Sequence, residues 1–269
     1  MCIILVLQQS LLKYTQFQSS FHPLQGAVMS RQFFCAVVVA ASFLGPTSVH
    51  AQSAKLPVAS PQATIPDAET IEITRKRANE GNPIAQFNMG VYAEKGWSMP
   101  VDMVAARSWY LLACEQGHIK AQFNLALMYL LGEGGPEEPL NAVKYFTLAA
   151  DQGDAPAQNN LGIMYEGGNG VPKNAKLAFS WYLKAAGAGN VASQVALGSM
   201  YRTGRGTERD AAKAAGWYLK AAEAGNALAQ ERIGYLYATG QGVVRDPVAS
   251  AKWTGLAKEA GVRITTVTD

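Results

Sequence analysis

Histidine and cysteine are scarce in this 269-residue chain, which contains three of each. Catalysis by an activated nucleophile needs a nearby base, usually histidine, and a metal site needs several ligands that converge. Beyond residue 51, where we expect the mature chain to begin, only Cys114 and His118 are left. A single cysteine cannot form an internal disulfide. The sequence therefore predicts no catalytic residues, no metal site and no cofactor.

Charge is also sparse, at 16% of residues, and the two signs nearly balance. Loss of a leader up to residue 51 removes Lys13 and Arg31 and no acid, so the net charge falls from +3 to +1. This balance gives no electrostatic case for nucleic acid or for an anionic membrane surface. Glu94 and Glu166 stand at matching positions of the repeat described below, but two stacked units separate them. We therefore expect no carboxylate pair placed for acid–base catalysis.

An apolar run long enough to cross a membrane is missing. The run at 33–44 has twelve residues, fewer than the roughly 20 that span a bilayer. A short basic head (29–32) precedes it, and 49–51 offers residues that a signal peptidase accepts. We expect a signal peptide over 29–51, cut after Ala51, and a periplasmic or secreted protein without an integral membrane span. Residues 1–28 are interpreted as an upstream gene-model extension.

What the chain has in quantity is regular spacing. Glycine recurs every 36 residues, at 81, 117, 153, 189, 225 and 261, and Ala-Gln or Ser-Gln recurs with the same step from 85–86. Within a unit, apolar residues follow a helical period twice, with glycine and proline between the two runs. A helix pair leaves an apolar face that only a neighbouring pair can bury. The sequence therefore predicts an all-α protein, an α-solenoid of five 36-residue helix-turn-helix repeats.

The same spacing divides the chain. We expect a Pro/Ala-rich linker at 52–66, an N-terminal capping helix at 67–81, a solenoid at 82–261 and a C-terminal tail at 262–269. The predicted repeats are 82–117, 118–153, 154–189, 190–225 and 226–261. The stretch YEGGNGVPKN at 165–174 looks like a phosphate-binding loop when it is read alone. Because its glycines recur in phase in most units and follow a helix, we interpret it as a turn between paired helices.

The third unit reads AQNNLGIMYEGGNGVPKN at 157–174 and AFSWYLKAAGAG at 178–189. It resembles the Sel-1-like repeat family, which is related to tetratricopeptide-repeat proteins. The resemblance covers the five repeats and implies an adaptor that binds other proteins. A cysteine-rich branch of the family has been credited with binding or slowly hydrolysing β-lactams. That branch carries a regular cysteine pair in each repeat, whereas only Cys114 is present here.

Resemblance to tetratricopeptide domains implies that the first helix of each repeat lines a concave face. An exposed apolar strip on such a face is typical of an interaction surface, although the same side chains could pack against adjacent first helices. An asparagine there could hydrogen-bond the backbone of an extended peptide, or could cap local backbone groups. The predicted partner-binding residues are Phe87, Asn88, Val91, Phe123, Asn124, Leu127, Asn159, Asn160, Ile163, Arg202 and Tyr235.

These observations predict an exported, non-enzymatic scaffold, a periplasmic regulator or envelope adaptor that binds a protein or an extended peptide. Two alternatives stay open, a β-lactam-interacting protein and a secreted host-interaction factor. Self-association is a further possibility, because one inter-helix turn holds Arg202, Arg205 and Arg209 and another holds Glu133, Glu137 and Glu138.

Overall fold

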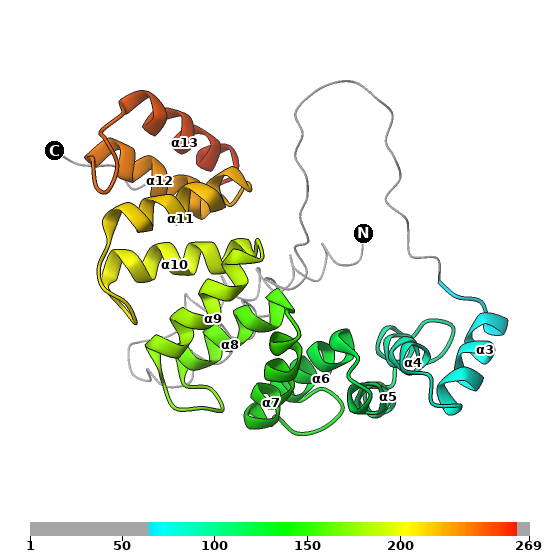
Figure 1. The fold of residues 1–269 in the computed structure, drawn as a ribbon. Helices are drawn as coiled ribbons and strands as arrows, with labels where there is room; N and C mark the ends of the chain where they lie inside the picture. The colour runs from blue at the N-terminus through cyan, green and yellow to red at the C-terminus, as the bar shows by residue number, and fades with distance from the viewer. Residues whose placement is uncertain (1–64, 263–269) are drawn as a thin grey trace, which may run out of the picture. The chain divides into compact units, whose positions relative to one another are not determined.

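The computed structural model describes residues 65–262, and the expected extension, signal peptide, tail after 262 and most of the linker lie outside this range. Within it the chain forms eleven helices and no strand (Figure 1). Their bounds are α3 Ala68–Asn79, α4 Pro83–Lys95, α5 Met103–Glu115, α6 Ile119–Leu131, α7 Pro139–Asp151, α8 Ala155–Gly167, α9 Ala175–Gly187, α10 Val191–Thr203, α11 Ala211–Glu223, α12 Ala227–Thr239 and α13 Pro247–Glu259. Helix α3 precedes five helix pairs, so the predicted α-solenoid with an N-terminal capping helix is confirmed.

The first helix of each pair, called the A helix here, has both ends set by polar and glycine residues. The A helices are α4, α6, α8, α10 and α12. Each follows a residue whose side chain accepts a hydrogen bond from the backbone N–H three positions later, namely Asn82, His118, Asp154, Asn190 and Asn226. Each ends at a left-handed glycine, such as Gly168 with φ 75°. The polar residue before each A helix accepts a hydrogen bond from a backbone N–H of the first turn, which has no acceptor within the helix. The left-handed glycine at the other end lets the chain leave the helix and turn.

The second helix of each pair, the B helix, follows a turn that contains another glycine with positive φ. Gly134, Gly170, Gly206 and Gly242 occupy equivalent positions in four turns. A Cβ on Gly206 would lie 2.2 Å from the backbone oxygen of Ala175, at the start of the preceding B helix. This glycine therefore permits close backbone contact between repeats, as well as an unusual backbone angle.

Alanine forms the middle of the core. Five B-helix alanines at steps of 36 residues are fully buried, namely Ala113, Ala149, Ala185, Ala221 and Ala257. Each helix packs against the next one along the chain, both within a repeat and between repeats. The small side chains let helices approach closely, while Leu125, Leu161, Leu197 and Ile233 fill the space from the A helices.

Candidate partner-binding face

One position near the middle of every A helix is neither buried nor fully exposed. These positions form a row that is called the A-helix row here: Val91, Leu127, Ile163, Ser199 and Tyr235. Two of them, Ile163 and Tyr235, pack partly against buried core clusters and leave part of the side chain in contact with solvent. The predicted residues Phe87 and Phe123 are half-buried as well, and Arg202 is exposed. The row is thus a partly apolar face that the described residues cover only in part.

The asparagines of the predicted set have different surroundings. Asn88 and Asn124 are half-buried, whereas Asn159 and Asn160 are only 3% and 1% exposed. Asn159 accepts a hydrogen bond from the Ser193 hydroxyl at 2.8 Å. Asn160 has no hydrogen-bond partner for either side-chain atom. In this structure, therefore, Asn159 and Asn160 have internal positions, and a peptide contact by the asparagines stays a prediction.

Two tyrosines of the B helices bind carboxylates at the ends of the A helices. The Tyr110 hydroxyl donates to Glu94 Oε2 at 2.7 Å, and the Tyr182 hydroxyl donates to Glu166 Oε2 at 2.8 Å. Burial and the adjacent carboxylate raise the pKa of both hydroxyls. Both tyrosines are therefore protonated donors at neutral pH, and they hold the carboxylates in place.

Each Glu–Tyr pair lies next to two residues of the following repeat, one in its A helix and one in its inter-helix turn. The four positions together are called a junction here. At junction 1, Asn124 hydrogen-bonds Tyr110, and the charge of Glu133 lies close enough to affect that hydroxyl. At junction 3 the residue equivalent to Glu133 is Arg205, and its guanidinium pairs with Glu166. The same place in the repeat thus holds an acid in one junction and a base in another.

The four junctions follow from the 36-residue equivalence. Junction 1 is Glu94, Tyr110, Asn124 and Glu133; junction 2 is Leu130, Phe146, Asn160 and Asn169; junction 3 is Glu166, Tyr182, Ala196 and Arg205; junction 4 is Arg202, Tyr218, Arg232 and Gln241. At junction 2 the glutamate and the tyrosine are replaced together by leucine and phenylalanine. Phe146 has no hydroxyl, so Asn160 lacks the partner that its equivalent Asn124 has in Tyr110.

The recurrent glutamine of the A helices has a structural role. Gln86 Nε2 donates to the Ala78 carbonyl at 3.2 Å, and Gln158 and Gln230 make the same contact two and four repeats further on, with Ala150 and Ala222. The glutamine thus satisfies a carbonyl in the last turn of the preceding helix. Because it is buried and serves the backbone, it is not a candidate for ligand contact.

Cys114 and His118, whose side chains could in principle act in catalysis, both have structural roles. Cys114 is buried, and desolvation raises the pKa of its thiol to about 12. The thiolate that would act as a nucleophile is therefore suppressed at neutral pH. His118 Nδ1 accepts the Ala121 N–H at 3.2 Å, and its ring stacks on Phe87 with centroids 4.6 Å apart. Desolvation, helped by Lys120, lowers the pKa of this imidazole, which suits an uncharged cap.

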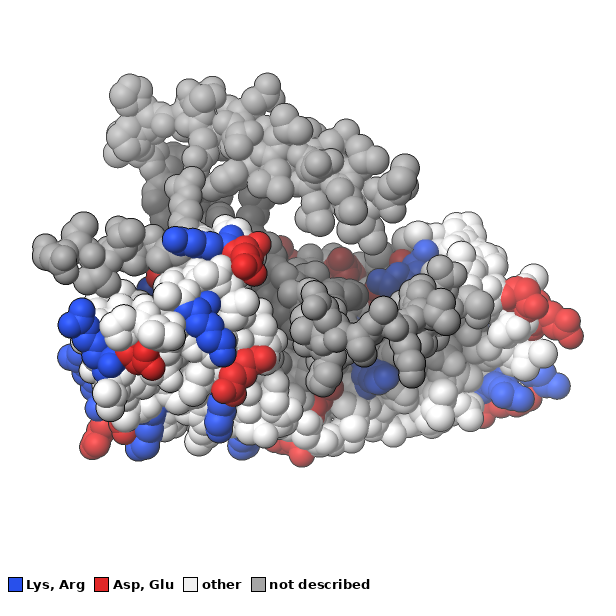
Figure 2. All heavy atoms as spheres, turned by 90° about the horizontal axis from the view of Figure 1, so that it is seen from above, with Lys and Arg blue, Asp and Glu red and all other residues white. Residues whose placement is uncertain are grey.

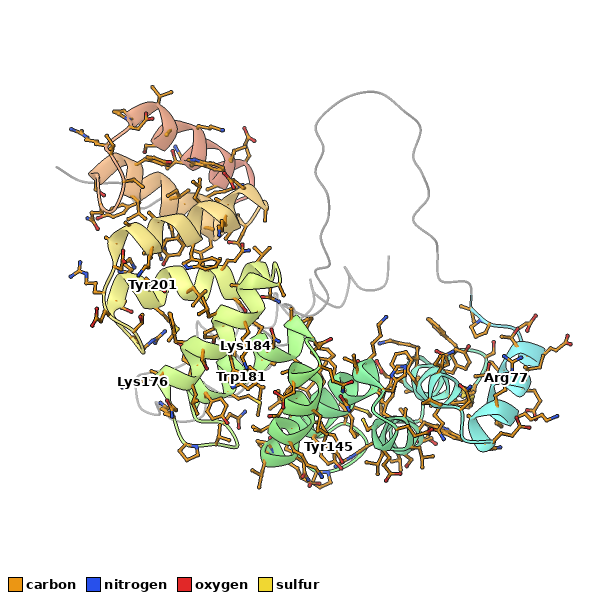
Figure 3. All side chains as sticks on the ribbon, in the orientation of Figure 1. Arg77, Tyr145, Lys176, Trp181, Lys184 and Tyr201 are labelled. Carbon is orange, nitrogen blue, oxygen red and sulfur yellow. The ribbon has the colours of Figure 1, made fainter. Side chains whose placement is uncertain are left out.

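Aromatic rings and lysines lie close together on the B helices. Lys184 Nζ lies 3.9 Å from the centre of the Trp181 ring (Figure 3), and Lys220 lies 4.5 Å from that of Trp217. These cation–π contacts cover the rings with charged side chains. On the face seen in Figure 2, basic and acidic side chains are interspersed among uncharged ones. That face offers no large area of a single charge to a partner.

Within residues 65–262, no cluster of three or more histidine, cysteine or acidic side chains is placed to hold a metal ion. In the same range, no helix combines the length and the apolarity that a membrane span requires.

Sequence reasoning placed Arg202 on the face and recognised Glu94 and Glu166 as equivalent positions, but it missed the tyrosines that bind these two carboxylates and the loop residues next to them. A signal for the junctions was present. The second repeat has Leu130 at the position of Glu94 and Glu166. Sixteen residues later it has Phe146 at the position of the tyrosine. Paired substitution between repeats of one chain could therefore have identified the contact.

Comparison with known proteins identifies a family model and several solved structures that resemble this chain. A family model described as Sel1 repeat matches residues 83–118, 119–154, 155–190, 191–226 and 227–262. The structure resembles that of c5321, described as a protective antigen of uropathogenic Escherichia coli strains with an SLR fold, at 36% identity and a TM-score of 0.69. That match covers 71% of this chain and 41% of the E. coli chain, so it spans less than half of that protein.

A Sel1 repeat protein from Oxalobacter formigenes is 31% identical, with a TM-score of 0.66, over 73% of this chain and 86% of that one. A comparison with curated proteins gave no match.

Proposed function

Because the chain belongs to the Sel1 repeat family, whose members generally mediate protein–protein interaction and are typically not catalytic, we propose that it is an exported scaffold. In this proposal its A-helix row binds a protein or an extended peptide in the periplasm or cell envelope. The export signal expected at 29–51 supports the location, and the family supports the class of partner.

The observation that carries the proposal is the A-helix row. A position that is half-exposed in all five A helices repeats at the spacing of the solenoid. In the first three repeats it holds Val91, Leu127 and Ile163, which keep apolar surface in contact with water although the neighbouring leucines are fully buried. Covering this surface with a partner releases that water and favours binding.

Affinity capture from an envelope extract tests the proposal. The bait is residues 52–269, and bound proteins are identified by mass spectrometry. The Leu127→Lys variant should lose the captured partner, because a charge in the middle of the row opposes apolar contact. The matched control is Leu148→Lys, since Leu148 is 42% exposed on a B helix. Loss of the partner from both variants, or from neither, would contradict binding through the A-helix row, provided that thermal melting shows both to be folded.

A second candidate function is favoured by one comparison. The similar E. coli protein is described as a protective antigen, which is in line with a secreted or surface-exposed role that meets a host. Detection of this chain in the culture medium, rather than in the periplasmic fraction, would favour this candidate over the envelope scaffold.

A further inference from the structure

The four junctions differ in charge, and the difference has an order along the chain. Junction 1 carries two acids, Glu94 and Glu133, and junction 4 carries two bases, Arg202 and Arg232. Neighbouring side chains reduce these charges without cancelling them, because Lys95 pairs with Glu94 and Glu231 lies 3.3 Å from Arg232. The first junction is therefore net acidic and the fourth net basic.

The two junctions between them are neutral for different reasons. Junction 2 has Leu130 and Phe146 in place of the charged and hydroxyl groups, and junction 3 pairs Glu166 with Arg205. The A-helix row next to these junctions contributes Leu127 and Ile163. A partner that follows the row from the first repeat to the fifth would thus meet acid, then apolar surface, then base.

These charges are accessible to a partner. The Glu94 side chain is 20% exposed, the Arg232 side chain is 45% exposed, and Arg202 is exposed as well. Glu133 is half-buried, and its pKa is raised by burial and by the charge of Glu94. The repulsion between the carboxylates of Glu94 and Glu133 decreases when a cation approaches them.

The molecule itself shows what fits beside such a carboxylate. At junction 3 the Arg205 guanidinium lies on Glu166, which Tyr182 holds from the other side. Junction 1 has the same Glu–Tyr pair, Glu94 and Tyr110, but an acid stands where the guanidinium would come from. Lys95 pairs with one oxygen of Glu94, and Glu133 adds a second acid, so a basic side chain supplied by another molecule would neutralise junction 1 as Arg205 neutralises junction 3.

We propose that the A-helix row takes an extended segment of another protein that is basic at the end over junction 1, apolar and small in the middle, and acidic at the end over junction 4. This assignment rests on the proposed function and names the chemistry of its partner. Adjacent helices pack 8–10 Å apart, so three repeat steps correspond to roughly 30 Å, or about nine residues of extended chain.

A synthetic peptide tests this assignment. The probe is an acetylated and amidated ten-residue peptide with two arginines at one end, alternating valine and serine in the middle, and two glutamates at the other end. Its control has the same composition with the charges interleaved. Fluorescence anisotropy at low salt should show tighter binding of the segregated peptide, because only that peptide can satisfy both junctions at once. Added salt should weaken its binding.

Three variants locate the binding. Glu133→Arg and Arg202→Glu should each weaken the segregated peptide about fivefold, the effect of roughly 1 kcal/mol from one exposed ion pair. Glu137→Arg is the matched control, because it makes the same charge change in the same turn at an exposed position outside the junctions. It should leave the affinity within twofold. Glu133→Arg should also raise the melting temperature, since the new side chain can pair with Glu94 as Arg205 pairs with Glu166.

Equal affinity for the two peptides, or equal loss in Glu137→Arg and Glu133→Arg, would overturn the assignment. The proposed function fails separately, since it requires Leu127→Lys to lose the captured partner. If that variant loses the partner and the peptide shows no preference, the A-helix row binds a partner of different charge. If the peptide binds a monomer of this chain but not an isolated dimer, the row is an interface between copies, and the assignment to another protein is wrong.

Discussion

At the scale of single residues, the absence of a tyrosine hydroxyl from junction 2 should lower the stability of the fold by a measurable amount. Asn160 is buried with both amide atoms unpartnered, and Phe146 stands where Tyr110 meets Asn124 in the junction before it. Phe146→Tyr should therefore raise the free energy of unfolding by about 1 kcal/mol, the net worth of a typical hydrogen bond. Urea denaturation measures the change. In an Asn160→Leu background the same substitution should give no gain, and an equal gain there would show that the hydroxyl acts elsewhere.

His118 makes stability depend on pH. The helix cap needs an unprotonated Nδ1, and burial lowers the pKa of the folded imidazole below its ordinary value of 6.5. The unfolded chain therefore takes up the proton first as the pH falls. The stability that the cap contributes is present above pH 6.5 and is lost as the pH falls through that value towards the folded pKa.

His118→Asn is the direct test of this dependence. Asparagine caps three other A helices at the equivalent position, as Asn82, Asn190 and Asn226. The variant should melt increasingly above the native chain as the pH is lowered from 7.5 to 5. A difference in melting temperature between the variant and the native chain that stays constant over this pH interval would mean that the cap survives protonation.

At the scale of elements, the connection between successive repeats is incomplete in the second half of the chain. Gln116 donates to Gln86 Oε1 at 2.7 Å, and Gln152 donates to Gln122 Oε1 at 2.8 Å. The next position in this series is Ala188, and Gln158 Oε1 accordingly has no partner. Ala188→Gln should supply the donor and stabilise the fold by about 1 kcal/mol. Ala188→Met, which has similar length but no donor, should give no such gain in chemical denaturation.

The inter-helix turns explain why one repeat lacks a glycine that the others share. Ser98 occupies the position of Gly134, Gly170, Gly206 and Gly242, with φ 52°. No B helix precedes the first repeat, and the Ser98 hydroxyl instead donates to the Pro66 carbonyl at 2.8 Å. Gly206→Ala should cost about 2 kcal/mol or more, because it adds a clash with Ala175 to the strain of a left-handed backbone. Ser98→Ala should cost less in the same thermal melts, since only its hydrogen bond is lost.

The sequence predicted the helix pairs because each glycine, cap and alanine acts within its own unit, so a fixed spacing reveals it. The junctions were not predicted, because Glu94 and Tyr110 belong to different helices and Glu133 to the next repeat. Their proximity depends on how the helices cross, which spacing alone does not specify. The burial of Asn160 was missed for the same reason, although its equivalent Asn124 stays half-exposed.

At the scale of the whole molecule, the fifth repeat differs from the others in the polarity of its outer face. Thr254 and Lys258 of α13 stand where the preceding B helix has Tyr218 and Ala222, which are buried by α12 and its neighbours. A lysine at that position is exposed in α13 and would be buried without a partner if another repeat were stacked on it. Terminal repeats of solenoids need such a polar outer face to stay soluble. The C-terminal end of the array therefore opposes open-ended stacking of one copy on another.

Truncation tests this role of α13. A chain that ends at Asn226 exposes the apolar end of α11 and should self-associate, which light scattering after size-exclusion chromatography would detect. Transferring the terminal residues by Tyr218→Thr with Ala222→Lys should keep that truncated chain monomeric, because the new end has the polarity of α13. A chain that ends at Val262 retains α13 and is the control, expected to be monomeric with no further change. If the doubly substituted truncation still self-associates while the control does not, polarity at these two positions is insufficient to end the array.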